Sequence, residues 1–448
     1  MRKFTKPHPL ALLVGGIFFA AALTWVIPAG EYQRRDDPVS GKSVVVNGTY
    51  HRVEAQPVGP MQVLVAIPVG IEQGADIIIF VFLAGGALLV LDRTGVLRAA
   101  VDGLSRTLGH RETLIIPVFC LVFGTMGAVE NMQEEIIALM PLLLIVTAGV
   151  GFDSLTAAAM SVGAAMVGSA FSPFNPFQAI IAMKLAGLPP GSASGFRLVM
   201  LLVAMSVWTA ATMRYALRTR GPKREKAVAA PRGGSAARSW MAGMIAMAAL
   251  ALFIIGVTRW KWGFEEMGAL FFAMGVLAGL VGGLGVNGTA EGFAEGFGQM
   301  AYASLLIGFA RVIRVVLEQG HVMDTVVYGL FTPLAHVPLV ASAAGMVAVQ
   351  GIIHVAVPSV SGQAALTMPV LVPLSDLLGM SRQVTVLAYQ TGSGMCELLT
   401  PTNGAMMAVI AAAGVSFDKW MRFALPVVGV LVAGALAAIY LAMVIGLQ

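Results

Sequence analysis

The sequence predicts an all-α polytopic membrane protein made of inverted repeats, with about nine transmembrane spans, two re-entrant hairpins and two broken helices. Three observations support this prediction. The 448-residue chain is 58% hydrophobic and only 11% charged, whereas soluble domains carry about a quarter charged residues. Its apolar runs are long enough to cross a bilayer. Two of these runs are interrupted by a short polar motif, and an internal duplication relates the two motifs.

The two interruptions are Ser172–Asn175, with the sequence SPFN, and Thr400–Asn403, with the sequence TPTN. The proline in each motif cannot donate a backbone hydrogen bond and breaks the helix, which frees carbonyl groups beside the hydroxyl and amide side chains. A bilayer core offers no water to these groups. Each break must therefore be buried in protein or line a wet cavity.

The duplication extends beyond the two motifs. Ser172 and Thr400 are 228 positions apart (400 − 172), and the pair Met140-Pro141 recurs as Met368-Pro369 at the same offset. Residues 70–104 also align with 296–330 at an offset of 226, with ten of 35 positions identical. Broken helices at equivalent places in two repeats indicate the midplane binding site of a transporter.

The first half of the duplication covers residues 1–213. An apolar run over 10–27 follows a basic N-terminus, which predicts a retained first span and a cytoplasmic N-terminus. Further along, two apolar pieces too short to span a bilayer flank an acidic segment, which predicts a re-entrant hairpin with an acidic tip. In order, we then expect an external polar loop (31–60), a connector (61–74), a span (75–91), a cytoplasmic arm with four arginines (92–112), a re-entrant hairpin (113–151), a broken helix (154–186) and a span (196–216).

A basic segment at 214–239 separates the halves. It holds eight Lys or Arg between Arg214 and Arg238 and has no apolar pattern, so the positive-inside rule predicts a cytoplasmic linker. A nucleic-acid-binding arm would look similar in isolation, but the flanking membrane segments favour a linker, and no nucleic-acid partner is expected.

The second half covers residues 240–448. We expect spans at 240–258, 267–285 and 301–317, an arm at 318–338, a re-entrant hairpin at 339–379, a broken helix at 383–415 and a final span from Phe423. The second arm contains no Lys or Arg, in contrast to the first. The two arms therefore lie on opposite sides of the membrane, which makes the repeats inverted. Nine spans and a cytoplasmic N-terminus place the C-terminus outside.

Three segments resemble the C4-dicarboxylate anaerobic carrier (DcuC/YfcC-like) family of the ion transporter superfamily. They are PSVSGQAALTMP (Pro358–Pro369), the acidic tip ENMQEE (Glu130–Glu135) and TPTNGAMMAVIAAAG (Thr400–Gly414). The resemblance covers most of the chain. It implies a scaffold that forms a homodimer and a transport domain of hairpins and broken helices that moves as an elevator.

In such a fold each hairpin tip meets the break of a helix, which predicts two polar clusters. Hydroxyl, amide and freed carbonyl oxygens can bind Na⁺, and half-helix N-termini favour a carboxylate. The first predicted cluster contains Glu130, Asn131, Glu134, Ser172, Pro173 and Asn175, the second contains Ser359, Ser361, Gly362, Gln363, Thr400, Pro401, Thr402 and Asn403, and Na⁺ is predicted at Ser172, Asn175, Thr400 and Asn403. The alternative is that these residues only cap or turn a kinked helix.

Three acidic residues are predicted to act in the clusters. Glu130 or Glu134 would bind a proton or cation, or face a cationic group of the substrate, unless the tip carboxylates only accept backbone hydrogen bonds or pair with an arginine. Glu397 lies three residues before Thr400, and a carboxylate within a membrane marks an ion or substrate path.

Three basic residues are interpreted as structural. Arg311 and Arg314 share a helix face, and Glu318 is four residues from Arg314, which favours scaffold pairing or snorkelling over substrate binding. His354 is interpreted as a core histidine rather than a proton site.

Together these features predict a secondary active transporter of small carboxylate-bearing metabolites, a C4-dicarboxylate or a related organic anion. We expect coupling to Na⁺ or H⁺, no other cofactor, the bacterial inner membrane as the location, and lipid and small-molecule partners. A basic amino acid antiporter of the arginine/ornithine type is the alternative, and a passive channel is an alternative of another class. No nucleophile and base pair suggests an enzyme.

Overall fold

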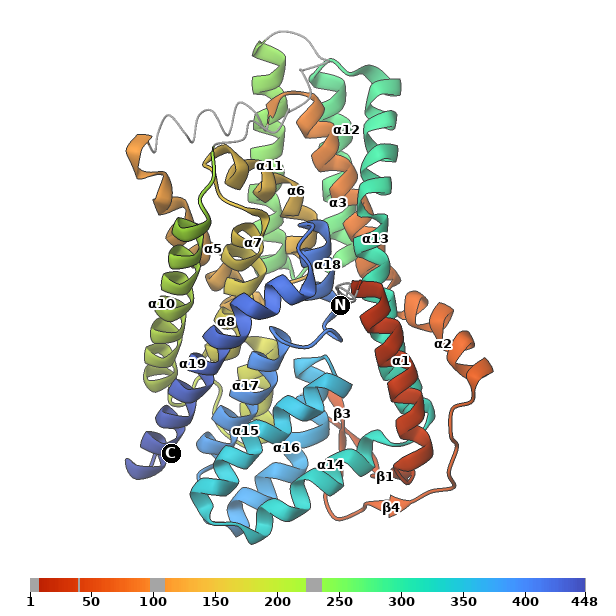
Figure 1. The fold of residues 1–448 in the computed structure, drawn as a ribbon, viewed down its shortest axis with the longest axis vertical. Coiled ribbons are helices and arrows are strands. Elements are labelled where there is room, and N and C mark those ends of the chain that lie inside the picture. The colour runs from red at the N-terminus through yellow and green to blue at the C-terminus, as the bar shows by residue number, and fades with distance from the viewer. Residues whose placement is uncertain (1–7, 39–40, 97–108, 223–235, 448) are drawn as a thin grey trace, which may run out of the picture.

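The computed structural model describes residues 8–38, 41–96, 109–222 and 236–447 and is shown in Figure 1. Helices dominate the described chain. In the first half they are α1 (Pro9–Val26), α2 (Pro60–Gln73), α3 (Ala75–Arg93), a 3₁₀ turn (Gly109–Leu114), α5 (Ile115–Glu130), α6 (Glu135–Gly149), α7 (Ser154–Ala158), a π-helical turn (Ala159–Gly163), α8 (Ala164–Phe171), a second π-helical turn (Pro176–Ile180), α9 (Ile181–Leu185) and α10 (Ser194–Thr219).

The second half has the same kinds of element. Its helices are α11 (Ala236–Trp260), α12 (Phe264–Val281), α13 (Gly285–Gln319), α14 (Met323–Phe331), a 3₁₀ turn (Thr332–His336), α15 (Leu339–Ala356), α16 (Val360–Leu377), α17 (Arg382–Glu397), α18 (Gly404–Ala412) and α19 (Phe417–Val444). Four short strands lie between α1 and α2: β1 (Gly30–Glu31), β2 (Arg34–Asp37), β3 (Lys42–Val45) and β4 (His51–Arg52).

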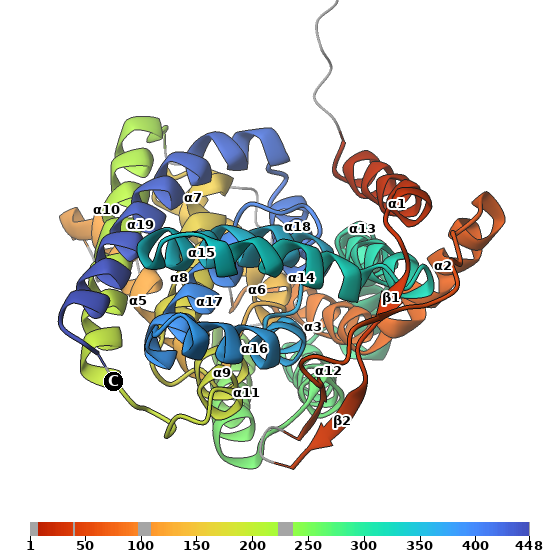
Figure 2. The same cartoon turned by 90° about the horizontal axis from the view of Figure 1, so that it is seen from below.

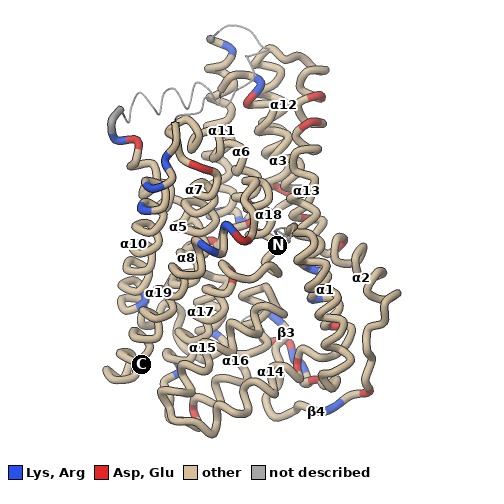
Figure 3. The backbone as a smooth tube through the Cα atoms, viewed as in Figure 1, with Lys and Arg blue, Asp and Glu red and all other residues tan. Residues whose placement is uncertain are grey.

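Within the described residues, ten helices are long and apolar enough to cross a membrane. Two of them, α5 and α15, are the first arms of helical hairpins, and the broken helix α17–α18 is not among the ten. If the hairpins are re-entrant, eight of these helices and the second broken helix make the predicted nine spans. Figure 3 shows few charged positions along the long helices. The predicted class, an all-α polytopic membrane protein, is confirmed.

Helices α3 and α13 pack against each other in opposite directions. Gly70, in α2 shortly before α3 begins, lies against Val312 of α13, and Gly86 of α3 lies against Gly296 of α13. Under the 226-residue offset Gly70 corresponds to Gly296, and Gly86 corresponds to Val312, so one contact is the image of the other. A second pair of contacts, Ile71 with Gly308 and Phe82 with Phe297, is related in the same way. The two repeats therefore meet across a local two-fold axis, as inverted repeats do.

The hairpins and broken helices form a second group. Hairpin α5–α6 has its tip at 131–134 and packs on α8, where Gly127 touches the backbone of Ala165. Hairpin α15–α16 has its tip at 357–359 and packs on α17, where Gly392 touches the backbone of Val347. We call α5–α10 with α15–α19 the hairpin group, and α1–α3 with α11–α13 the α3–α13 group. Figure 2 shows α14, α15 and α16 across the lower face of the molecule.

The helices of the two hairpins lie at 115–149 and 339–377, and those of the two broken helices at 154–185 and 382–412. Three other segments differ from the expected elements. The connector 61–74 is helix α2, and α10 continues through Arg214 to Thr219. Helix α13 begins at Gly285, sixteen residues before the predicted span (301 − 285), because its glycines pack on α3: Gly292 lies against Val90 and Gly296 against Gly86. Most of the first arm and residues 223–235 of the linker lie outside the described residues.

Candidate functional site

A cavity of about 380 Å³ lies where both hairpin tips meet α13 and the break between α17 and α18. Its walls come from both repeats and from both helix groups. Its polar lining consists of Gln73, Asn131, Gln133, Glu134, Arg311, Arg314, Ser359, Ser361, Glu397, Thr402 and Asn403. The structure thus combines parts of the two predicted clusters in one site.

The cavity is lined by two carboxyl groups and two guanidinium groups. Glu134 and Glu397 come from the hairpin group, whereas Arg311 and Arg314 come from α13. Glu397 is only 4% exposed, and its Oε2 accepts a hydrogen bond from Gln133 Nε2 at 2.9 Å. Burial strengthens the interaction of such charges with a ligand because little water screens them. The cavity can therefore hold an anionic group near α13 and a cationic group near the carboxylates.

The second break faces this cavity. Helix α17 ends at Glu397, and α18 starts at Gly404, where Asn403 Oδ1 accepts the backbone N–H of Met406 at 3.0 Å. The hydroxyls of Thr400 and Thr402 are 2.7 Å apart. Gly404 and Ala405, the first residues of α18, also line the cavity. The N-terminus of α18 thus adds partial positive charge to the wall, which favours an anion.

The first break is closed by hydrogen bonds to its own hairpin. Ser172 Oγ donates to the carbonyl of Ala128 at 2.6 Å, and Asn175 Nδ2 donates to the carbonyl of Gly127 at 2.9 Å. Asn175 Oδ1 accepts the backbone N–H groups of Phe177 and Gln178. Ser172 and Asn175 are fully buried. This arrangement fastens the first hairpin to the first broken helix.

Eight of the fifteen predicted site residues do not line the cavity. They are Glu130, Ser172, Pro173, Asn175, Gly362, Gln363, Thr400 and Pro401. Of the four predicted Na⁺ ligands, only Asn403 lines it. Glu130 forms an ion pair with Lys261 at 3.0 Å, on the turn between α11 and α12. The geometry thus places Glu134, and not Glu130, beside the other charged groups of the cavity.

Gln363 belongs to a buried network inside the second hairpin. Its Oε1 is 2.8 Å from His354 Nδ1, and its Nε2 donates to the carbonyl of Gln350 at 2.8 Å. His354 is fully buried and does not line the cavity. This placement agrees with the interpretation of His354 as a core residue.

Arg311 was interpreted from the sequence as structural, but it lines the cavity. It also donates a hydrogen bond to the carbonyl of Gln73, which holds α13 to the end of α2. Arg314, in contrast, pairs with Glu318 at 2.7 Å, as the four-residue spacing predicts. Gln133 was missed entirely. The sequence does mark Arg311 as unusual, because it is an arginine inside an apolar span. Whether its side chain faces the cavity depends on how α13 packs, which the sequence does not show.

These features define a polytopic membrane transporter with helical hairpins and broken helices around an internal polar cavity. The chain belongs to the C4-dicarboxylate anaerobic carrier family, whose model matches residues 7–444. An Escherichia coli (strain K12) protein provisionally named basic amino acid antiporter YfcC is 30% identical over 484 residues, covering 96% of this chain and 95% of the relative.

Two further proteins are similar over nearly their whole length. An uncharacterized Haemophilus influenzae protein is 28% identical over 490 residues, covering 96% of this chain and 95% of that protein. The structure of the Alcanivorax borkumensis YdaH transporter matches with a TM-score of 0.45 and 16% identity, covering 98% of this chain and 99% of that one.

Proposed function

We propose that this protein is a secondary active transporter of small carboxylate-bearing metabolites, a C4-dicarboxylate or a related organic anion. The observation that carries the proposal is the position of Arg311 in a cavity lined by both hairpin tips. A guanidinium group binds a carboxylate through two parallel hydrogen bonds, which gives geometric selectivity as well as affinity. The N-terminus of α18 supports the same anion.

Glu134 and Glu397 are proposed to bind the coupling cation, Na⁺ or H⁺. Two carboxylates in a buried cavity repel each other unless a cation or proton neutralises them. An anionic substrate at Arg311 adds negative charge to the same cavity, so the substrate and the cation stabilise each other's binding. Such reciprocal coupling is what cotransport requires.

The division into two helix groups supports an elevator mechanism. The cavity lies between the hairpin group and α13. A movement of the hairpin group along α13 would therefore carry the hairpin tips and helix breaks from one side of the membrane towards the other. We further propose that the α3–α13 group is the stationary scaffold and forms a homodimer in the bacterial inner membrane. The large exposed apolar residues of α11, among them Trp240, Met247 and Ile254, can face either lipid or a second copy of this group.

Basic amino acid exchange is the second candidate function. The observation in its favour is the pair of carboxylates in the cavity, which matches the cationic groups of arginine or ornithine while Arg311 matches the carboxylate. The provisional name of the E. coli relative points to the same substrate class.

The test is uptake by proteoliposomes containing the purified protein. Radiolabelled succinate and L-arginine are each offered with and without a Na⁺ gradient, a pH gradient, and unlabelled substrate inside. Accumulation of succinate that needs a cation gradient supports the first function, whereas L-arginine uptake that needs internal L-arginine or L-ornithine supports the second. Flux without saturation or accumulation would indicate a passive channel and would overturn both.

A further inference from the structure

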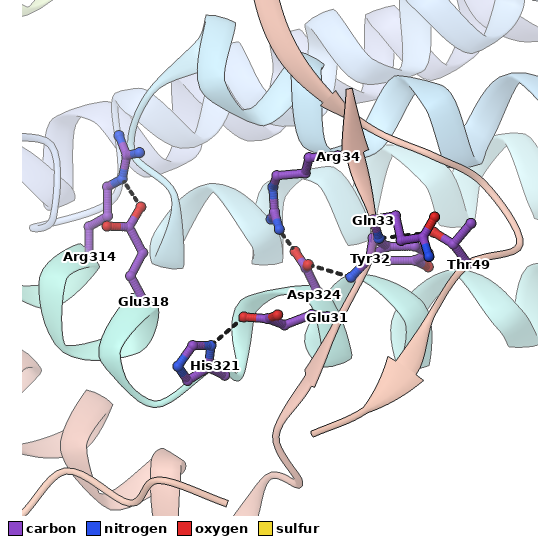
Figure 4. Close-up of polar contacts among 9 residues, drawn as sticks. All are labelled: Glu31, Tyr32, Gln33, Arg34, Thr49, Arg314, Glu318, His321 and Asp324. Carbon is purple, nitrogen blue, oxygen red and sulfur yellow. Dashed lines mark hydrogen bonds and ion pairs between the residues drawn. The ribbon is translucent and has the colours of Figure 1, made fainter. Parts of the chain in front are cut away.

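A second cavity, of about 520 Å³, lies between strands β1–β3, the end of α13, α14 and α16. Its location is at the end of the molecule opposite the start of α11, as Figure 1 shows. Two ion pairs line it, as Figure 4 shows: Arg34 with Asp324 at 2.8 Å and Arg314 with Glu318 at 2.7 Å. His321 Nδ1 also lies 2.5 Å from Glu31 Oε1. The predicted topology makes this the external side.

Lys42 differs from the other cations that line this second cavity. Its Nζ donates a hydrogen bond to Ser361 Oγ at 2.8 Å, and no carboxylate in the described part of the chain pairs with it. Burial lowers the pKa of Lys42, and the charge of Arg314 lowers it further. Glu318 balances the charge of Arg314, whereas the ammonium group of Lys42 has only the hydroxyl of Ser361 as its hydrogen-bond partner among the described residues and can accept a carboxylate as a stronger one.

The position of Lys42 joins the two cavities. Arg314 lines both of them. Ser361 lines the inner cavity, and the next residue, Gly362, lines the outer one. Strand β3 carries Lys42 and packs on α16, so the ammonium group is held at the boundary by regular structure.

We propose that Lys42 is a substrate ligand, which the β2–β3 hairpin presents to the tip of the second helical hairpin. The ammonium group exchanges its hydrogen bond with Ser361 for one with the carboxylate of the substrate as the substrate enters the inner cavity. Lys42 and Arg311 then bind carboxylate from opposite sides of the tip. This inference rests on the proposed function, because it requires a substrate with a carboxylate.

The simpler alternative is that Lys42 only fastens strand β3 to α16. The two roles differ in what they recognise. A fastener affects every substrate alike, whereas a ligand discriminates a carboxylate from its ester. The test therefore compares binding of succinate with monomethyl succinate, and of L-arginine with L-arginine methyl ester, by isothermal titration calorimetry on the purified full-length protein.

Three variants make the comparison: Lys42→Met, Lys42→Arg, and the control Arg35→Met. Arg35 is an exposed cation on the neighbouring strand and does not line the cavity. The wild type should bind succinate or L-arginine, and we expect Lys42→Met to bind the same acid roughly tenfold more weakly, since hydrogen bonds to charged groups have about this effect. The affinity for the ester should change little. Lys42→Arg should keep part of the wild-type preference for the acid over its ester, and Arg35→Met should keep all of that preference.

One result would overturn the inference while leaving the proposed function intact. It is an acid-to-ester affinity ratio in Lys42→Met equal to that of the wild type, whether both affinities are unchanged or both fall by the same factor. A wild-type protein that binds neither succinate nor L-arginine would overturn the proposed function, and the inference with it. A melting temperature close to that of the wild type shows that the variants are folded.

Discussion

Gln133 Nε2 donates a hydrogen bond of 2.9 Å to Glu397 Oε2, which joins the tip of the first hairpin to the second broken helix. The two residues belong to different repeats. The polar groups of the repeats therefore meet in one cavity, instead of the two separate clusters that the sequence predicts. An acidic group from each repeat, Glu134 and Glu397, lines that cavity.

The Glu397→Gln variant tests the role of the negative charge. Glutamine keeps the shape of the side chain but cannot bind a coupling cation electrostatically. We expect uptake of the substrate found in the proteoliposome assay to fall by roughly tenfold or more, because a charged group in a membrane protein interior is functional by default. Glu54→Gln, a change at an exposed position between α1 and α2, is the matched control. Wild-type uptake with wild-type cation dependence in Glu397→Gln would contradict the assignment.

Asn175→Ala and Asn403→Ala should have different effects although the two residues are equivalent in the repeats. Asn175 makes hydrogen bonds to Gly127 and to two backbone N–H groups, so its loss should lower the stability of the fold by about 1–3 kcal/mol. Asn403 lines the cavity and makes one such bond, to Met406. Its variant should lose uptake with a smaller change in melting temperature. Equal melting temperatures and equal uptake for the two variants would refute this distinction.

The contact between the two repeats is testable at Gly296. A Cβ atom there would lie 2.5 Å from the Cα of Gly86, and no side-chain rotation can relieve a clash with backbone. Gly296→Ala should therefore destabilise the protein by about 1–3 kcal/mol. Gly298→Ala, on the same helix, meets nothing within 4 Å and serves as the control. Thermal unfolding in detergent measures both, and identical melting temperatures would disprove the contact.

Asp153 links three helices at the end of the hairpin group where α7 begins. Its carboxylate accepts hydrogen bonds from Lys419 at 2.8 Å, Tyr215 at 2.8 Å and Thr156 at 3.0 Å. Burial alone would raise the pKa of Asp153, but these hydrogen bonds, that from Lys419 first, outweigh burial and lower it.

A carboxyl whose pKa is lower in the folded state stabilises that state at pH values above its unfolded pKa of about 3.9, and the stabilisation is lost as the pH falls through the folded pKa. Asp153→Asn should therefore unfold at a lower temperature than the wild type at pH 7. The difference should shrink as the pH falls from about 5 towards 3. A difference that stays constant with pH would show that the charge of Asp153 does not stabilise the fold.

The hairpins and the breaks could be predicted from the sequence because their signals are local. Pro173 and Pro401 lie at the two breaks, and the nearby Asn175 and Asn403 begin the next helical segments as capping residues. The duplication then gave independent support, since a second copy of each signal occurs at a fixed offset. The same offset relates the contact of Gly86 with Gly296 to that of Gly70 with Val312, although it predicts neither contact by itself.

The features that could not be predicted from the sequence depend on contacts between distant segments. The glycine-rich start of α13 carries Glu291 and Glu295 and has no apolar run, so only its packing on α3 explains the helix. Arg311 faces the cavity and Glu130 faces Lys261. Both directions depend on how each helix is oriented about its own axis when it packs on its neighbours. Strand β3, which carries Lys42, has only four residues (KSVV), too few for its position against α16 to be predicted from the sequence.

The measurement that tests the central claim most directly is carboxylate binding by the Arg311→Gln variant, by isothermal titration calorimetry with succinate and L-arginine. We expect the wild type to bind at least one of them and Arg311→Gln to bind it roughly tenfold more weakly or not at all. Arg259→Gln, which removes an exposed arginine at the end of α11, should bind like the wild type. Unchanged affinity in a folded Arg311→Gln protein would contradict the assignment of this cavity as the carboxylate site.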